Sequence, residues 1–263
     1  MDSTKELQSE NKTFKGFNGN QLKLFAIIAM TIDHLTCVIW PGYNYQWWIL
    51  LLHLIGRLTA PTMWFMVAEG FYYTKNVKKY ISRLFIFAVF SHFAYNFAFG
   101  IPFIPFKTTF FNQTSVMWAL AWAVVFLYLS DDSRHDFKLK EWQKILALIV
   151  ICFITFPSDW SCFPVLCTSW INRNRGNLKR QIIGIELYLL MYTAVWIPCI
   201  DVVYGILQLG VVIVWPFMAN YNGQRGKWKG MKWFFYLYYP LHLILVGFLR
   251  LYLNGNIGVI IGG

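Results

Sequence analysis

The chain has 263 residues, of which 57% are hydrophobic and only 13% are charged. Soluble domains carry roughly 25% charged residues, so this composition excludes an ordinary soluble protein. It predicts one compact, all-α, polytopic membrane bundle whose apolar side chains contact lipid as well as each other. A net charge of +11 would suit nucleic-acid binding, but the chain has no basic nucleic-acid-binding motif, and we expect no nucleic-acid partner.

Hydrophobic stretches recur along the chain after a polar segment at residues 1–20, which we predict to be cytosolic. Nine stretches follow, at 22–40, 47–72, 81–100, 114–130, 143–157, 160–171, 182–197, 200–219 and 233–253. About 20 apolar residues cross a bilayer, so residues 21–253 are predicted to form a single transmembrane bundle of about nine spans. Two stretches in the middle are short, and Pro157 and Pro164 favour broken helices there. A glycine-rich tail at 254–263 is predicted to be flexible.

Most of the 23 basic residues lie in alternate connecting segments, at 5–23, 75–83, 134–144, 173–180 and 225–232. Cytoplasmic loops of membrane proteins carry an excess of Lys and Arg. The pattern therefore predicts an N-terminus inside and a C-terminus outside.

Four ionisable residues fall inside the first two hydrophobic stretches: Asp33, His34, Arg57 and Glu69. A charged residue near the centre of a membrane helix costs roughly 2.5–3.5 kcal/mol on insertion scales. Structural ion pairs that fix helix packing are one explanation. We favour a functional cavity, because a histidine accompanies the carboxylates and the arginine.

Asp33 and His34 are adjacent, so their side chains point about a quarter-turn apart on a helix. We expect a carboxylate of another helix, Glu69 or Asp159, to orient His34, while Asp33 could equally pair with Arg57. Ser158-Asp159-Trp160 allows two interpretations, a carboxylate that faces the cavity or a tight outer turn.

The last stretch and the loop before it supply further candidates. Tyr239 and His242 flank Pro240, and they form either a polar wall of the cavity or a packed helix kink. The basic loop at 222–227 contains Gly223, Arg225 and Gly226. Its amides and cations could hold phosphates, although a positive-inside loop would look much the same.

Motifs of other enzyme classes are missing. The chain contains neither an HExxH helix nor a Gly-x-Ser-x-Gly elbow, which argues against a metalloprotease or a serine hydrolase. Its five cysteines lack the spacing of a zinc site, so we expect no metal.

Several short segments, in order along the whole chain, resemble the TraX family, which is named for the membrane acetylase of conjugative F-type pilin. The matching segments are Leu22 to His34, Gly56-Arg57, Ala60-Pro61, Glu69-Gly70-Phe71, Lys78-Lys79-Tyr80 with Arg83, Ser158-Asp159-Trp160, Asn222-Gly223 to Gly226, Lys232 and Phe235 to His242. The resemblance implies a bacterial inner-membrane acyltransferase that uses cytosolic acetyl-CoA. It also implies kinship with a wider superfamily of membrane acetyltransferases, in which a histidine of the first membrane helix is central. The matching residue here is His34.

The leading hypothesis is acetyl transfer from acetyl-CoA to an amine or hydroxyl acceptor such as a peptide N-terminus or a glycan. His34 would act as base or acyl carrier, Asp33 or Glu69 would orient it, and Arg57 would polarise the thioester. Arg83, Arg225 and Lys232 at the cytosolic mouth would bind the phosphates of the donor. The same buried groups would also suit a proton-coupled transporter, and a purely structural membrane scaffold is a third interpretation.

Overall fold

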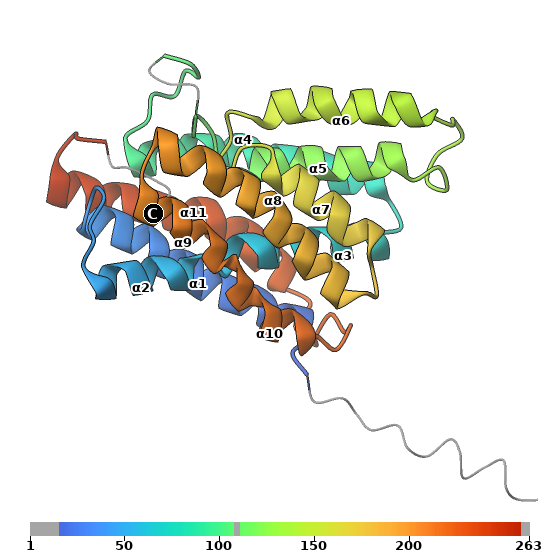
Figure 1. The fold of residues 1–263 in the computed structure, drawn as a ribbon, viewed down its shortest axis with the longest axis horizontal. Coiled ribbons are helices and arrows are strands. Elements are labelled where there is room, and N and C mark those ends of the chain that lie inside the picture. The colour runs from blue at the N-terminus through green and yellow to red at the C-terminus, as the bar shows by residue number, and fades with distance from the viewer. Residues whose placement is uncertain (1–15, 108–110, 259–263) are drawn as a thin grey trace, which may run out of the picture.

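The computed structural model describes residues 16–107 and 111–258, and these form an all-helical bundle without a β-sheet (Figure 1). The elements in order are α1 (Gly19–Ile39), α2 (Trp47–Gly56), α3 (Thr59–Tyr73), α4 (Val77–Phe99), α5 (Val116–Ser130), α6 (Glu141–Thr155), α7 (Phe163–Arg173), α8 (Leu178–Cys199), α9 (Val202–Leu207), the 3-10 helix η2 (Gln208–Val214), α10 (Trp215–Ala219) and α11 (Met231–Asn254). The all-α prediction is confirmed. Most of the polar segment predicted at 1–20 and half of the glycine-rich tail lie outside the described residues.

Each predicted hydrophobic stretch is largely helical, but within residues 16–107 and 111–258 only six helical segments are long and apolar enough to cross a membrane. They are α1, the α2–α3 pair, α4, α8, the run from α9 to α10, and α11. The other three helices, α5, α6 and α7, have 15, 15 and 11 residues. At 1.5 Å per residue, a 15-residue helix is about 22 Å long, short of the roughly 30 Å hydrocarbon core. The chain is thus a multi-pass membrane protein, and the prediction of nine spans is not confirmed.

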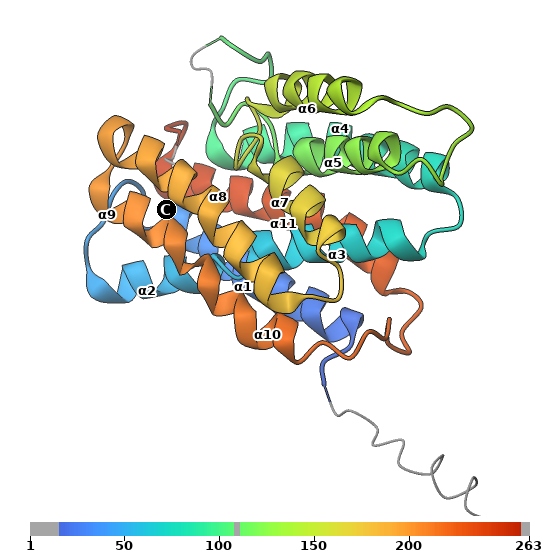
Figure 2. The ribbon, with the colours of Figure 1, turned by 45° about the vertical axis from the view of Figure 1, so that its right-hand side comes forward.

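The bundle has an interior of tightly packed side chains and an apolar outer surface. α11 packs between α1 and α4, and α4 also packs against α5. On α8, Leu187, Leu190, Met191 and Val195 are exposed. α6 lies at the edge of the bundle beside α5 in both views (Figures 1 and 2), and buries only Ile151 and Thr155. Such exposed apolar faces suit lipid contact.

The second candidate span, Trp47–Tyr73, is interrupted between α2 and α3, and this interruption places Arg57 inside the bundle. A Cβ atom on Gly56 would lie 2.4 Å from the Asp33 side chain, so only glycine allows α1 and α2 to approach this closely. Arg57 follows directly at the break. Pro61 lies in the first turn of α3, where its missing N–H costs no helical hydrogen bond.

The loop between α10 and α11 docks on the start of α1. Phe17 N–H donates to the Asn220 carbonyl over 2.6 Å, and Asn222 N–H donates to the Phe17 carbonyl over 2.9 Å. The backbone N–H groups of Gly19 and Asn20 donate to the Gln224 and Arg225 carbonyls. These bonds fix the basic loop over the N-terminal end of α1.

Candidate active site

A large cavity of about 570 Å³ opens between the ends of α1, α3, α4 and α11, and five basic side chains line it. They are Lys23, Lys75, Arg83, Arg225 and Lys232, and we call this space the basic cavity. Among the residues that the structure describes, Glu69 is the one carboxylate that lines it. So many cations around one cavity favour a ligand with several negative charges, such as a polyphosphate.

A small chamber of about 60 Å³ lies deeper in the bundle, and we call it the inner chamber. Five of the predicted catalytic residues line it: Asp33, His34, Arg57, Asp159 and Tyr239. The structure therefore brings together residues of α1, the α2–α3 break, the loop before α7, and α11.

The two spaces adjoin. Met63, Met117 and Phe235 line both the basic cavity and the inner chamber, and we call these three side chains the throat. All three are buried. These three side chains lie between the cations of the basic cavity and His34 of the inner chamber.

His34 pairs with His242 of α11. The two rings are nearly parallel, with centroids 5.1 Å apart, and His34 Nδ1 lies 2.9 Å from His242 Nε2. His242 Nδ1 in turn lies 3.0 Å from the Tyr238 carbonyl oxygen. Both rings are buried, but only His34 is among the residues that line the inner chamber.

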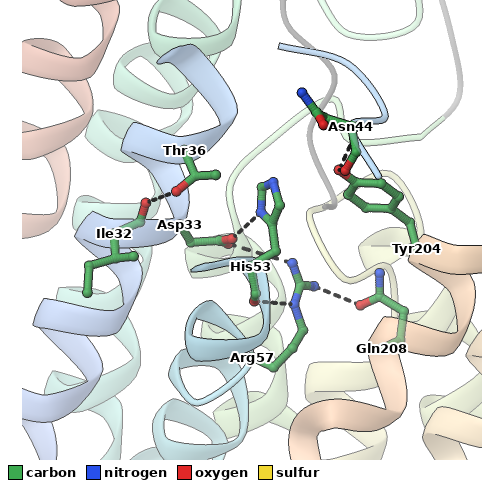
Figure 3. Close-up of polar contacts among 8 residues, drawn as sticks. All are labelled: Ile32, Asp33, Thr36, Asn44, His53, Arg57, Tyr204 and Gln208. Carbon is green, nitrogen blue, oxygen red and sulfur yellow. Dashed lines mark hydrogen bonds and ion pairs between the residues drawn. The ribbon is translucent and has the colours of Figure 1, made fainter. Parts of the chain in front are cut away.

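Asp33 points about a quarter-turn away around α1 and joins a second network (Figure 3). Its Oδ1 lies 2.8 Å from His53 Nδ1, and its Oδ2 lies 3.7 Å from Arg57 Nη2. Arg57 donates to the His53 carbonyl over 3.3 Å and to Gln208 Oε1 over 2.8 Å. Arg57 also lies 5.2 Å from the centre of the Trp160 ring. The guanidinium, 3% exposed, is thus held by groups from four segments of the chain.

The prediction that Asp33 or Glu69 orients His34 is wrong. Adjacent side chains diverge on a helix, and the Asp33 carboxylate contacts His53 and Arg57 instead of His34. Glu69 lines the basic cavity, where Arg175 Nε donates to its Oε1 over 2.9 Å. Burial opposes the charge of Arg175, but hydrogen bonding and attraction to Glu69 outweigh it and raise the pKa of the guanidinium.

Asp159 lies in a strained loop that faces the inner chamber. Its N–H donates to the Thr114 carbonyl over 2.8 Å, and Trp160 and Ser161 follow with φ angles of 62° and 52°. Such left-handed conformations are uncommon outside glycine and often occur at functional sites. The cavity-facing interpretation of Asp159 therefore describes its position better than an outer turn.

The predicted donor-binding residues fall into two groups. Arg83, Gly223, Arg225 and Lys232 line the basic cavity. Gly226 does not; it packs on the N-cap of α1, where a Cβ atom would lie 2.6 Å from Asn18 Oδ1.

Several residues of the site were not predicted from the sequence. Lys23, a cation at the predicted cytosolic end of the first helix, was a recognisable candidate for the basic cavity. Gln208 and the three throat residues could not be recognised as site residues from the sequence, because an uncharged side chain in an apolar stretch does not stand out. Asp33, Cys37 and His53 have ligand atoms within 4.8 Å of one another. Arg57 already neutralises Asp33 there, so we assign this group to helix packing.

Comparison with known proteins gives the family. The family model described as TraX protein matches residues 18–250, nearly the whole chain. The chain belongs to the TraX family. This TraX chain is also similar to the probable fimbrial assembly protein FimC, serogroup H1, of Dichelobacter nodosus, with 30% identity over 253 residues. That alignment covers 94% of the TraX chain and 100% of the relative, and no solved structure matches.

Proposed function

We propose that this TraX protein is a membrane acetyltransferase that moves an acetyl group from cytosolic acetyl-CoA to an acceptor amine or hydroxyl. One observation carries the proposal: a cavity lined by five cations adjoins a small chamber that contains His34. Coenzyme A has the matching shape, a polyphosphate head joined by a flexible arm to a thioester.

The donor would bind head first to the basic cavity. Arg83, Arg225 and Lys232 would attract its phosphates, together with Lys23 and Lys75. Glu69 would otherwise repel an anion, but Arg175 neutralises it. The pantetheine arm would pass through the throat, so that the acetyl thioester reaches the inner chamber.

In the inner chamber, the nucleophile of the acceptor would attack the thioester carbonyl while His34 takes its proton. The carbon–sulfur bond then breaks, and His34 returns that proton to the departing coenzyme A thiolate. A covalent route through acetyl-His34 has the same overall balance. A positioned base contributes about 10²–10⁴ in rate. Arg57 and Tyr239 line the chamber and are the candidates to stabilise the developing oxyanion.

An amine, such as a peptide N-terminus, is the acceptor that best fits the inner chamber. Asp159 offers a carboxylate to the chamber, and no ion pair within 4.0 Å is found for it among residues 16–107 and 111–258. Trp160 and Tyr192 stack beside it with centroids 5.7 Å apart. An ammonium group would meet both a negative charge and aromatic faces there, and transfer of one proton to Asp159 would free the nitrogen lone pair for attack. The name of the FimC relative, a fimbrial assembly protein, makes a fimbrial subunit a reasonable acceptor.

We place the basic cavity at the cytosolic face of a bacterial inner membrane, with the N-terminus inside and the C-terminus outside. The basic loops at 131–140 and 220–230 lie at one end of the bundle, and the loop after α4 and the end of α11 lie at the other (Figure 1). The excess of Lys and Arg at the first end supports this orientation. Asn112 belongs to the loop after α4, and Asp159 is hydrogen-bonded to Thr114 of that loop. Both residues line the inner chamber, so the acceptor would enter the chamber from this second end.

Binding of acetyl-CoA to the purified protein in detergent tests the donor site. We expect saturable binding that weakens with salt, and much weaker binding of acetyl-pantetheine, which lacks the nucleotide phosphates. Equal affinity for the two compounds, or none for either, would contradict the proposal. Substrate flux in sealed vesicles without any acyl donor would instead support the proton-coupled transporter.

A further inference from the structure

The stacked pair of His34 and His242 contains enough contacts to assign every ring proton. His34 comes from α1 and His242 from α11, 208 positions later. The exposed fractions are 8% and 4%, so bulk water does not compete for the nitrogens that lie between the two rings. Each nitrogen of a neutral imidazole is either a donor or an acceptor.

The assignment begins at the Tyr238 carbonyl. A carbonyl oxygen accepts only, so His242 Nδ1, 3.0 Å away, must carry a proton. The Nε2 atom of a neutral His242 is then an acceptor. His34 Nδ1 lies 2.9 Å from that Nε2 and must donate to it. The remaining atom, His34 Nε2, is therefore unprotonated and holds the free lone pair.

Charged groups near the pair leave this assignment intact. Asp33 is bound by His53 and Arg57, and Asp159 lines the inner chamber as part of the loop before α7. Neither carboxylate makes a hydrogen bond or ion pair to His34 or His242 in the described part of the chain. Both rings are consequently neutral, and each has a single proton.

We infer that His242 is a positioning residue that holds His34 in its Nδ1–H tautomer, so that Nε2 is the atom that takes the proton or the acetyl group. The inference rests on the proposed function. His34 lines the inner chamber and His242 does not, so the edge of His34 opposite Nδ1 faces the reactants. His242 takes the part that a carboxylate plays in many histidine-based sites.

The arrangement also stabilises the charged state of His34. When Nε2 gains a proton or an acetyl group, the ring becomes cationic, and its Nδ1–H bond to His242 becomes charge-assisted. Thr31 Oγ1, 2.7 Å from the Tyr238 hydroxyl, ties the turn of α11 that supplies the carbonyl back to α1. The His242 ring is fixed at both of its nitrogens, by His34 at Nε2 and by the Tyr238 carbonyl at Nδ1.

Two substitutions of His242 separate orientation from packing. His242→Gln keeps an acceptor oxygen near the position of Nε2, whereas His242→Leu fills the space without one. We expect His242→Leu to lower kcat for coenzyme A release about 10²-fold with an unchanged KM for acetyl-CoA, and His242→Gln to recover most of the loss. His92→Leu, a matched change outside both cavities, should keep the wild-type kcat. An unchanged kcat in His242→Leu would overturn the inference.

A spectroscopic measurement tests the tautomer without any activity. The chain has five histidines, so ¹⁵N-histidine labelling gives few ring signals, and those of His34 are the ones lost in His34→Gln. We expect His34 to show a protonated Nδ1 and an unprotonated Nε2, and to become a mixture of tautomers in His242→Leu. An Nε2–H form of His34 in the wild type would overturn the inference even if acetyl transfer is found. The expected signals without thiol release would instead support the tautomer and count against the proposed function.

Discussion

Asp33 and His34 are consecutive residues of α1, but their side chains belong to two separate polar networks. Asp33 contacts His53 and Arg57 at the α2–α3 break, and His34 contacts His242 of α11. The quarter-turn between adjacent helical positions sends one side chain to each neighbouring helix. Both side chains line the inner chamber, but Asp33 is bound to α2 and Arg57, whereas His34 is held by α11.

Removal of Asp33 should destabilise the bundle. Arg57 is 3% exposed, and a buried charge that loses its partner typically costs about 3–5 kcal/mol. We expect Asp33→Ala to lower the midpoint of thermal unfolding in detergent by several degrees. Asp132→Ala, which removes an exposed ion pair with Lys144, should change it little. Equal midpoints for Asp33→Ala and the wild type would show that Arg57 does not depend on this carboxylate.

Arg225 should contribute to donor affinity more than to turnover. Its side chain lines the basic cavity, whereas Lys227 in the same loop does not. A hydrogen bond to a charged group is worth about 1.5–3 kcal/mol, so Arg225→Ala should weaken acetyl-CoA binding roughly tenfold or more, with kcat at saturation retained. Lys227→Ala should bind the donor as the wild type does. Titration calorimetry would measure both, and an unchanged Kd in Arg225→Ala would remove this residue from the site.

The throat should limit the size of the acyl group. Met117 is 2% exposed and borders both cavities, so Met117→Ala would widen the passage into the 60 Å³ chamber. We expect this variant to accept propionyl-CoA or butyryl-CoA better, relative to acetyl-CoA, than the wild type does. Met218→Ala removes an equally buried methionine away from both cavities and should leave the ratio unchanged. Identical donor preferences in all three proteins would mean that the throat does not select the acyl chain.

Gly226 should matter for its contact with α1 as well as for its backbone angle. Gly226 has φ of 91° and packs on Asn18, whereas Gly176 has φ of 86° with open space around it. Alanine at either position strains the backbone, but only Gly226→Ala also displaces the basic loop. We expect Gly226→Ala to lower both thermal stability and donor affinity, and Gly176→Ala to lower stability alone. Comparable donor affinities in the two variants would show that the loop does not depend on this contact.

The sequence was sufficient for the fold class and for most of the acidic and basic residues that line the two cavities. Asp33, His34, Arg57 and Glu69 stood out because ionisable groups are rare inside apolar stretches. The partners of these residues could not be recognised in the same way, because the pairing depends on how the helices pack. His242 meets His34 from 208 positions away, and Arg175, which neutralises Glu69, looked like one more positive-inside residue. The prediction of nine spans is not confirmed for a related reason, since an apolar run of 15 residues does not reveal whether its helix crosses the bilayer.

Release of free thiol from acetyl-CoA by the purified protein tests the central claim most directly. The wild type should release coenzyme A slowly even without an acceptor, because water can replace the nucleophile in the inner chamber. His34→Gln should bind acetyl-CoA as tightly as the wild type and release about 10²-fold less thiol or none. Release that is equal in the two proteins, or absent from a wild type that also fails to bind acetyl-CoA, would contradict acetyl transfer at His34.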